Sequence, residues 1–236
     1  MKKTNTLFLF LLVIRGCFAQ MPSTPAQLAE WLDHQPLEMP GETGFRSSEP
    51  TVSVARLRHR TPGKAWAAFF RGLKLANAGA WQQVALELEK AVTIDPAFAE
   101  AHNNLGVCDV ELKRFDSAAG ELRRAIELDP ADSVFHGNLS LVLILLHLRP
   151  EAEQEARTAV TLDAANSKAQ YLLGFLLAQR PETRDTAAEH LTYAAREMPD
   201  AHYLLSRIYQ DAGQTSRAGA ELERYRKAFS GQAKNK

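Results

Sequence analysis

Apolar residues between positions 65 and 229 recur at the three- and four-residue spacing of amphipathic helices, and the whole pattern then repeats. Ala91, Ala125 and Ala159 lie 34 residues apart, and each is followed at the same distance by an aliphatic residue and an aspartate. The same period relates leucines and small residues at Leu105, Leu139, Leu173, Gly72, Gly106, Ser140 and Gly174. Such a period predicts an all-α protein of stacked helical hairpins, over residues 65–98, 99–132, 133–166, 168–200 and 201–229.

The residue types at these positions suit a stack of helices. A hairpin of two amphipathic helices cannot bury its apolar side alone, so it has to pack against the next hairpin. Small residues such as Gly106 let two helix axes approach to about 8 Å where they cross, and the proline of Asp129-Pro130 ends a hairpin by disfavouring helical backbone before it. Residues 139–146 are apolar on nearly every side, which predicts a central place in the stack. The last helix is predicted to cap the stack with a polar outer face: Glu221, Glu223, Arg224, Arg226 and Lys227.

The repeat resembles the tetratricopeptide repeat (TPR), in which each unit is a helix A, a tight turn and a helix B. Gly106 matches the family's small residue at the helix crossing, Ala118 and Ala125 match its alanines on helix B, and Pro130 matches its terminal proline. The resemblance implies a right-handed α-solenoid of about five helix pairs over residues 63–230. An irregular segment (20–62) precedes it, and a disordered tail (231–236) follows it.

The first nineteen residues have the features of an export signal. Lys2 and Lys3 precede an apolar run at 7–14, which as a helix covers about 12 Å, too short for a hydrocarbon core of about 30 Å. Small residues at Cys17 and Ala19 predict a signal peptide with cleavage after Ala19. An alternative is lipidation at Cys17, because residues 14–17 resemble a bacterial lipobox, although Arg15 departs from that pattern. Both predict export, to the periplasm or the extracellular space or to a lipid anchor on the cell envelope; retention of an uncleaved N-terminus is the third interpretation.

Residues 20–62 alternate between short predicted elements and breakers. Thr24-Pro25 begins one short helix with an apolar stripe at Leu28, Trp31 and Leu32. Several prolines and glycines follow, and residues 51–55 then alternate as in a short strand. The basic residues between positions 56 and 64 are interpreted as a solvated linker, with binding to an anionic lipid head or an acidic peptide as the alternative.

Composition and motifs argue against catalysis, metal binding and nucleic-acid binding. Lysine plus arginine and aspartate plus glutamate number 28 each, so no net charge attracts nucleic acid. The chain has no H-E-x-x-H and no Cys-x-x-Cys motif, and no phosphate-binding glycine loop. His102 and His136, 34 residues apart, are interpreted as equivalent packing residues, and Cys108 as a buried, inert thiol. We therefore expect a non-catalytic protein with no cofactor and no metal.

The resemblance to TPR proteins also implies a concave groove lined by the A helices, in which peptides lie. Asn104 and Asn138 match a groove-side asparagine that can bond a ligand's backbone. The other groove positions map to Phe69, Leu73, Asn103, Val107, Leu141, Ile144, Lys168, Tyr171 and Phe175. The mainly apolar set predicts a partner with an apolar or amphipathic segment, unless these side chains simply pack inside the superhelix.

Two classes of function follow. The first is a protein–protein interaction scaffold that is exported to the cell envelope and holds a partner peptide or protein in the groove. In a variant of it, the chain's own residues 51–57 occupy the groove until the partner displaces them. The alternative is an enzyme accessory or small-ligand-binding envelope protein, whose site is formed by the N-terminal segment against the solenoid. A membrane contact is expected only through lipidation at Cys17. The sequence leaves the oligomeric state open.

Overall fold

The computed structural model describes residues 59–230. This part contains ten α-helices, one 3₁₀ turn and no strand. The helices are α3 (Gly63–Ala76), α4 (Trp81–Ile94), α5 (Ala99–Glu111), α6 (Phe115–Leu128), α7 (Ser133–Leu145), α8 (Arg149–Leu162), α9 (Ser167–Leu177), α10 (Arg184–Ala194), α11 (Asp200–Asp211) and α12 (Thr215–Ser230). The expected all-α helical repeat is confirmed. The predicted signal peptide, the short helix, the strand-like segment and the tail lie outside the described residues.

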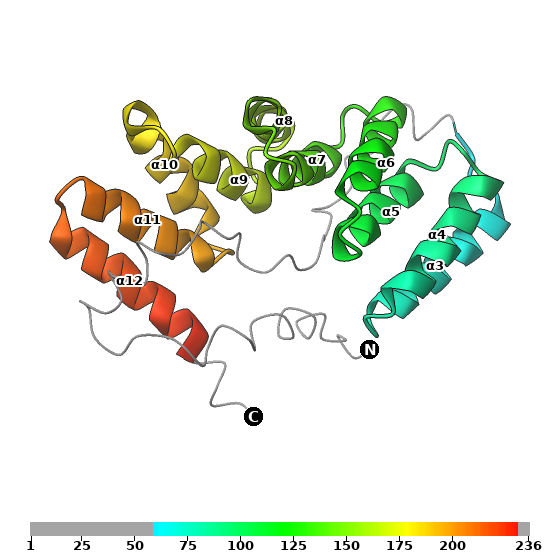
Figure 1. Ribbon diagram of the computed structural model, residues 1–236, viewed down its shortest axis with the longest axis horizontal. Helices are drawn as coiled ribbons and strands as arrows, with labels where there is room; N and C mark the ends of the chain where they lie inside the picture. Colours follow the sequence, from blue (N-terminus) through cyan, green and yellow to red (C-terminus); the bar gives the residue numbers. More distant parts are fainter. Residues whose placement is uncertain (1–58, 231–236) are drawn as a thin grey trace. The chain divides into compact units, whose positions relative to one another are not determined.

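The helices form five antiparallel pairs, α3/α4, α5/α6, α7/α8, α9/α10 and α11/α12, each of which packs tightly. We call the first helix of each pair its A helix and the second its B helix. Within the described residues, A helices also contact one another directly, α5 with α7 and α7 with α9, whereas no two B helices pack to the same extent. The A helices therefore line the inner side of the curved row, as Figure 1 shows for α7 and α9.

Small residues at the crossing of each pair set its close approach. A methyl group added at Gly106 would lie 2.7 Å from Cγ of Leu122, and one at Gly174 would lie 2.7 Å from Cγ of Leu191. At either distance the neighbouring leucine would have to shift, so both positions favour glycine. Ser140 occupies the same register on α7, where its hydroxyl donates to the carbonyl of Ala152 at 2.8 Å. This hydrogen bond therefore links α7 and α8 at a position where α5 and α9 have glycine.

The aspartates that follow the first three B helices hold the turns between pairs. The carboxylate of each accepts a hydrogen bond from the backbone N–H two residues on, a local motif that favours a turn over continued helix. The bonds join Ala97 to Asp95, Ala131 to Asp129 and Ala165 to Asp163. At Asp95 burial opposes the charge, but hydrogen bonds from His59 and from the Ala97 amide outweigh burial and hold the pKa of this carboxyl below its usual value.

The last two pairs depart from the strict period. The sequence predicts an enlarged turn at residues 180–185, inside the fourth pair. There a 3₁₀ turn, Pro181–Thr183, lengthens the connection between α9 and α10. Positions on α11 follow the equivalent positions on α9 after 32 residues instead of 34, as Ser206 and Gly174 at the helix crossings show. Four of the five residues predicted on the polar face of α12 are exposed. The prediction is wrong for Glu221, which is 8% exposed because its carboxylate accepts a hydrogen bond from His202 of α11.

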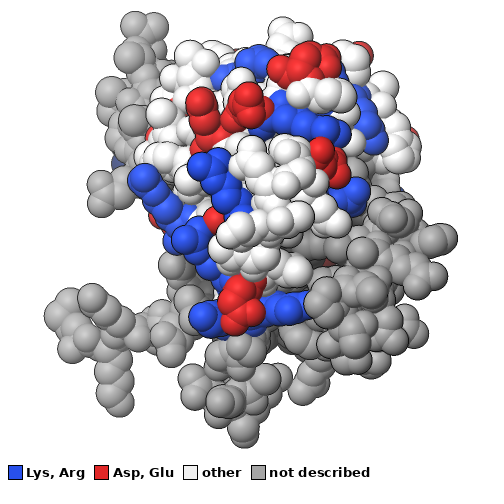
Figure 2. Space-filling model, turned by 90° about the vertical axis from the view of Figure 1, so that its left-hand side faces the viewer, with Lys and Arg blue, Asp and Glu red and all other residues white. Residues whose placement is uncertain are grey.

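Figure 2 views the end of the row that α10, α11 and α12 form, where basic and acidic side chains are interspersed. Such a mixed polar surface suits the terminal pair of a repeat stack, because no further pair covers it. None of the helices between residues 59 and 230 combines the length and the apolar character that a membrane span requires.

Candidate functional site: the inner face of the A helices

The positions predicted to line the groove fall into two registers that recur on successive A helices. Phe69, Asn103 and Tyr171 share one register, with Gly137 at the place on α7. Leu73, Val107, Leu141 and Phe175 share the other. Six of the eleven predicted residues are buried: Phe69, Asn103, Asn138, Leu141, Tyr171 and Phe175. The other five are partly exposed: Leu73, Asn104, Val107, Ile144 and Lys168. The six buried side chains pack inside the stack, whereas the five partly exposed side chains have surface left with which to contact a ligand.

Polar side chains from three successive A helices form a continuous chain of hydrogen bonds. The amide nitrogen of Asn138 on α7 donates to Oδ1 of Asn103 on α5 at 2.7 Å. Nζ of Lys168 on α9 donates to Oδ1 of Asn138 at 3.5 Å, near the upper limit for such a bond. Asn138 is only 1% exposed, so these bonds satisfy polar atoms that solvent does not reach. The chain of bonds ties α5, α7 and α9 together.

The predicted groove-side asparagines differ in their partners. Asn104, which is partly exposed, donates through its amide to the backbone carbonyl of Glu100 one helical turn earlier on α5 at 2.7 Å. Asn138 is buried and bonds across helices to side chains. Only Asn104 therefore lies where a ligand can reach it without entering the interior.

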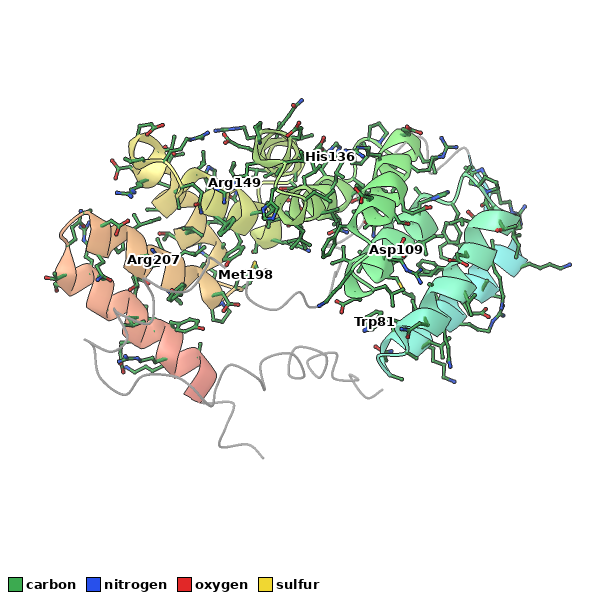
Figure 3. All side chains as sticks on the ribbon, in the orientation of Figure 1. Trp81, Asp109, His136, Arg149, Met198 and Arg207 are labelled. Atoms are coloured by element: carbon green, nitrogen blue, oxygen red, sulfur yellow. The ribbon has the colours of Figure 1, made fainter. Side chains whose placement is uncertain are left out.

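The next A helix contributes groove positions that sequence reasoning missed. Through the 32-residue step, Asp200, Tyr203 and Arg207 of α11 correspond to Lys168, Tyr171 and Phe175 of α9. The step is fixed by the small residue at the crossing, Ser206 on α11 for Gly174 on α9. Re-aligning the last repeat on Ser206 and His202 is the signal that finds them. Figure 3 labels Arg207 on α11.

One buried polar group at this end of the inner face has no partner among the described residues. The hydroxyl of Tyr171 is buried and, within residues 59–230, has no hydrogen-bond partner. Burial raises the pKa of this phenol, and the negative charge of Asp200 raises it further. Burial likewise raises the pKa of Asp200 to about 6, although its own backbone amide donates to it. Tyr203 of α11 stacks obliquely on Tyr225 of α12, with ring centroids 5.7 Å apart.

The comparisons with known proteins agree with this architecture. A family model described as "Tetratricopeptide repeat" matches residues 75–141, a stretch that spans the end of α3 to the middle of α7 and so includes the α5/α6 pair. The helical pairs between residues 59 and 230 have the fold of tetratricopeptide repeats. No curated protein is detectably similar to it in sequence.

Several solved structures share the fold of these tetratricopeptide repeats. PilW, a widely conserved type IV pilus biogenesis factor, is 19% identical with a TM-score of 0.65, and the match covers 72% of this chain and 79% of PilW. PilF of Pseudomonas aeruginosa is 22% identical with a TM-score of 0.63, over 70% of this chain and 76% of that one. YrrB, a TPR protein with an unusual peptide-binding site, is 19% identical with a TM-score of 0.55, over 68% and 84%. At these identities the likeness shows the fold.

A second network of hydrogen bonds recurs between the A and B helices of the four pairs from α5/α6 to α11/α12. Nδ1 of His136 lies 2.6 Å from Glu155, and its Nε2 lies 3.1 Å from the carbonyl of Pro130 in the preceding turn (His136 is labelled in Figure 3). His102 repeats both contacts, with Glu121 and Pro96. Because both ring nitrogens face acceptors, the histidine makes both bonds only as the doubly protonated ring. These histidines therefore do more than fill space, and the partner glutamates lie outside the sequence-based expectation.

The α9/α10 repeat makes the same network with exchanged residue types. Gln170 takes the place of the histidine on the A helix, and His190 takes the place of the glutamate on the B helix. Nδ1 of His190 donates to Oε1 of Gln170 at 2.6 Å, while the amide of Gln170 donates to the carbonyl of Ala164 at 2.8 Å. The geometry is kept without an acidic partner.

The remaining candidates for chemistry do not form a site. Cys108 is buried, as expected, and its thiol donates to the carbonyl of Trp81 at 3.2 Å. Burial raises the pKa of the thiol to about 12, which keeps it in the unreactive protonated form at neutral pH. Within the described residues, no group of three or more histidine, cysteine or acidic side chains is arranged to hold a metal ion.

Proposed function

We propose that this protein is a non-catalytic scaffold that binds an apolar or amphipathic segment of a partner protein along the inner face of its A helices. The observation that carries the proposal is the row of partly exposed apolar side chains, Leu73, Val107 and Ile144, on three successive A helices. Side chains with this exposure have apolar area left to bury against a ligand. Asn104 precedes Val107 by three residues on the same helix, so the two side chains are neighbours on its surface, and Asn104 can bond a peptide backbone.

The tetratricopeptide repeat fold itself is consistent with protein–protein interaction. A stack of helical pairs offers an extended concave surface because each pair is rotated slightly relative to the previous one. YrrB, which shares the fold, has a peptide-binding site according to its description. We extend that mode of binding to this chain as part of the proposal.

Site-specific photo-crosslinking in cells tests the location of the partner. A photoreactive amino acid at Val107, on the inner face, is expected to give adducts with a defined partner protein. The same amino acid at Gln154, which is exposed on the B helix α8, serves as the matched control and is expected to give none. Equal adducts at both positions, or none at Val107, would contradict binding on the inner face.

Export to the cell envelope is the second part of the proposal, and it rests on the N-terminal sequence. Mass measurement of the chain purified from fractionated cells separates the three interpretations. Cleavage after Ala19 gives an unmodified envelope protein, a diacylglyceryl mass on Cys17 gives a lipid anchor, and an intact Met1 in the cytoplasmic fraction contradicts export.

A further inference from the structure

The first helix of the row, α3, exposes basic and apolar side chains along one side. Its exposed side chains recur every three or four residues, so they share one side of the helix: Lys64, Ala67, Phe70, Arg71 and Lys74. We call these five residues the α3 stripe. From Lys64 to Lys74 it extends about 15 Å along the helix axis. None of the 14 residues of α3 is acidic. Figure 1 shows the α3/α4 pair at the opposite end of the row from α11/α12.

Phe70 differs from the residues at the same register on later A helices. Asn138 on α7 and Leu172 on α9 follow Phe70 after two and three periods of 34 residues, and each is 1% exposed. This register faces the preceding A helix, since the amide of Asn138 bonds to Asn103 of α5. Within the described residues no helical pair precedes α3. Phe70 is therefore 59% exposed.

Neighbouring aromatic rings support the exposed ring of Phe70. Trp66, one helical turn earlier, stacks on it with ring centroids 5.4 Å apart and 23° between the ring planes. Trp66 also contacts the buried rings of Phe69 and Phe98, with centroids 5.6 and 4.6 Å away. The partly exposed Trp66 thus connects Phe70 to the core, and the helix presents the exposed ring from a packed support.

The two ends of the row differ in what they expose. A terminal repeat of a solenoid normally has a polar outer face, and α12 has one. At the other end, the α3/α4 pair carries three of the five large apolar side chains that are exposed among residues 59–230: Phe70, Leu86 and Ile94. Large apolar side chains that gather at one end of a molecule, with polar residues around them, indicate a contact surface.

The charges near the α3 stripe are mainly positive. Arg71 and Lys90 of α4 share one acidic partner, because Nε of Arg71 lies 2.7 Å and Nζ of Lys90 lies 2.5 Å from the carboxylate of Glu87. A single carboxylate therefore balances two cations. Lys64 and Lys74 are exposed and form no ion pair with another residue of the described chain.

We propose that the α3 stripe binds the surface of an anionic lipid bilayer. Cations are attracted to negative headgroups, and apolar side chains beside them enter the boundary between headgroups and acyl chains. Phe70 lies between Lys64 and Lys74 and can enter that boundary while the lysines contact headgroups. Three arginines between positions 56 and 60 add positive charge to the chain that leads into α3. Phe70 does not belong to the row of Leu73, Val107 and Ile144, so lipid binding here does not depend on the proposed function.

Other occupants suit the α3 stripe less well. A second copy that docked through the same stripe would bring cations against cations, which repel. An acidic polypeptide would match the lysines. However, aromatic side chains beside lysine and arginine on one side of a single helix are the pattern of helices that lie in a membrane surface. The bilayer therefore accounts for both Phe70 and the cations.

Cross-linking of the full chain to vesicles locates the contact. The probe is a vesicle of phosphatidylglycerol and phosphatidylcholine that carries a photoactivatable diazirine lipid. Trypsin cleaves after Lys64 and Arg71, so it releases residues 65–71 as one peptide. Mass spectrometry is expected to find lipid adducts on that peptide and none on residues 158–168, the control peptide with the exposed Leu162. Adducts confined to residues 1–58, or none on residues 65–71, would overturn the proposal.

Variants of the stripe test both kinds of contact, through the lipid concentration that half-saturates the adduct on the peptide containing residues 65–71. Phe70→Ser should raise it about tenfold, because burial of the ring is lost. Lys64→Gln combined with Lys74→Gln should raise it about fivefold for each lysine. Leu162→Ser, which removes an exposed apolar side chain of α8, is the control and should behave as the wild type does. Circular dichroism verifies that each variant is folded. Wild-type curves for Phe70→Ser and the double variant would overturn the proposal.

The alternative occupants give different results. Tighter binding of the chain to polyglutamate than to anionic vesicles would overturn the proposal in favour of an acidic polypeptide. Self-association without lipid that is lost in Phe70→Ser, measured by analytical ultracentrifugation, would overturn it in favour of a second copy. Photo-crosslinking at Val107 reports separately on the inner face, so the scaffold can stand where the lipid site fails.

Discussion

The two ends of the inner face treat their buried polar groups in opposite ways. Between α5, α7 and the start of α9, Asn103, Asn138 and Lys168 bond to one another across the helices. Between α9, α11 and α12, the hydroxyl of Tyr171 finds no partner among residues 59–230. The first arrangement stabilises the stack because every polar atom that solvent cannot reach is paired. The second weakens it, and such groups are the ones on which a ligand has most to gain.

Asn138→Ala disrupts the hydrogen-bonded end of the inner face and should have the largest effect on stability. The substitution removes the donor to Asn103, leaves Oδ1 of Asn103 buried without a partner and opens a cavity. We expect the free energy of unfolding to fall by about 2–4 kcal/mol. Urea denaturation followed by circular dichroism measures the loss.

Two further variants sharpen this result. Asn104→Ala removes an amide whose bond to Glu100 lies on a partly exposed helix surface, so it should cost less than about 1 kcal/mol. Tyr171→Phe removes only a hydroxyl without a partner, so stability should be unchanged or higher. A loss in Tyr171→Phe as large as that in Asn138→Ala would erase the distinction between the two ends.

Asp200→Asn tests the unsatisfied end with a smaller expected effect. The pKa of Asp200 is raised to about 6 from 3.8 in the folded protein, so folding favours the protonated form. The unfavourable contribution of Asp200 to wild-type stability should therefore disappear as the pH falls from about 7 to about 4. The full shift corresponds to about 3 kcal/mol, and partial exposure of the side chain reduces this to about 1–2 kcal/mol.

The measurement is the difference in unfolding free energy between Asp200→Asn and wild type. It should favour the variant by that amount near pH 7 and disappear near pH 4. Asp116→Asn, whose aspartate is exposed on α6, should show no such pH-dependent gain. A constant difference across the range would mean that burial does not act on the charge of Asp200.

The sequence predicts the helical repeat of this structure well because the residues that mark the helix crossings recur at a fixed spacing. The alanines at 91, 125 and 159 and the small residues at 72, 106, 140 and 174 mark every crossing of the first four pairs, and steric limits act on those residues wherever the helices meet. The enlarged turn at 180–185 is visible for the same reason, since extra residues between two helical patterns have to form a connection.

The polar contacts could not be predicted in the same way. Glu121, Glu155 and Glu221 resemble ordinary surface residues in the sequence, and they meet their histidines only because two helices cross at one angle. Asp200 escapes a search at a period of 34 because the last repeat is two residues short. The depth at which Tyr171 and Asn138 are buried depends on how the A helices approach one another, which no single repeat specifies.

The smallest predicted difference is one of pKa, between the histidine of the α7/α8 pair, His136, and the histidine of the α9/α10 pair, His190. Burial opposes the charge on His136, but hydrogen bonds with Glu155 and Pro130 and the charge of Glu155 outweigh it and raise its pKa. Burial and the charge of Arg157 lower the pKa of His190, whose partner is the neutral Gln170. His136 should therefore stabilise the fold below its unfolded pKa and lose that contribution as the pH rises.

His190 should behave in the opposite sense, because its lowered pKa makes protonation unfavourable in the folded protein. NMR titration of the two imidazole rings is expected to give a higher midpoint for His136 than for His190. The same sign should appear in stability: His136→Gln should be more harmful at mildly acidic than at alkaline pH, whereas His190→Gln should be least harmful in acid. Coincident midpoints would show that a glutamine partner in place of a glutamate partner leaves the pKa of the histidine unchanged. The contrast between the two ends of the molecule would then be confined to the inner face.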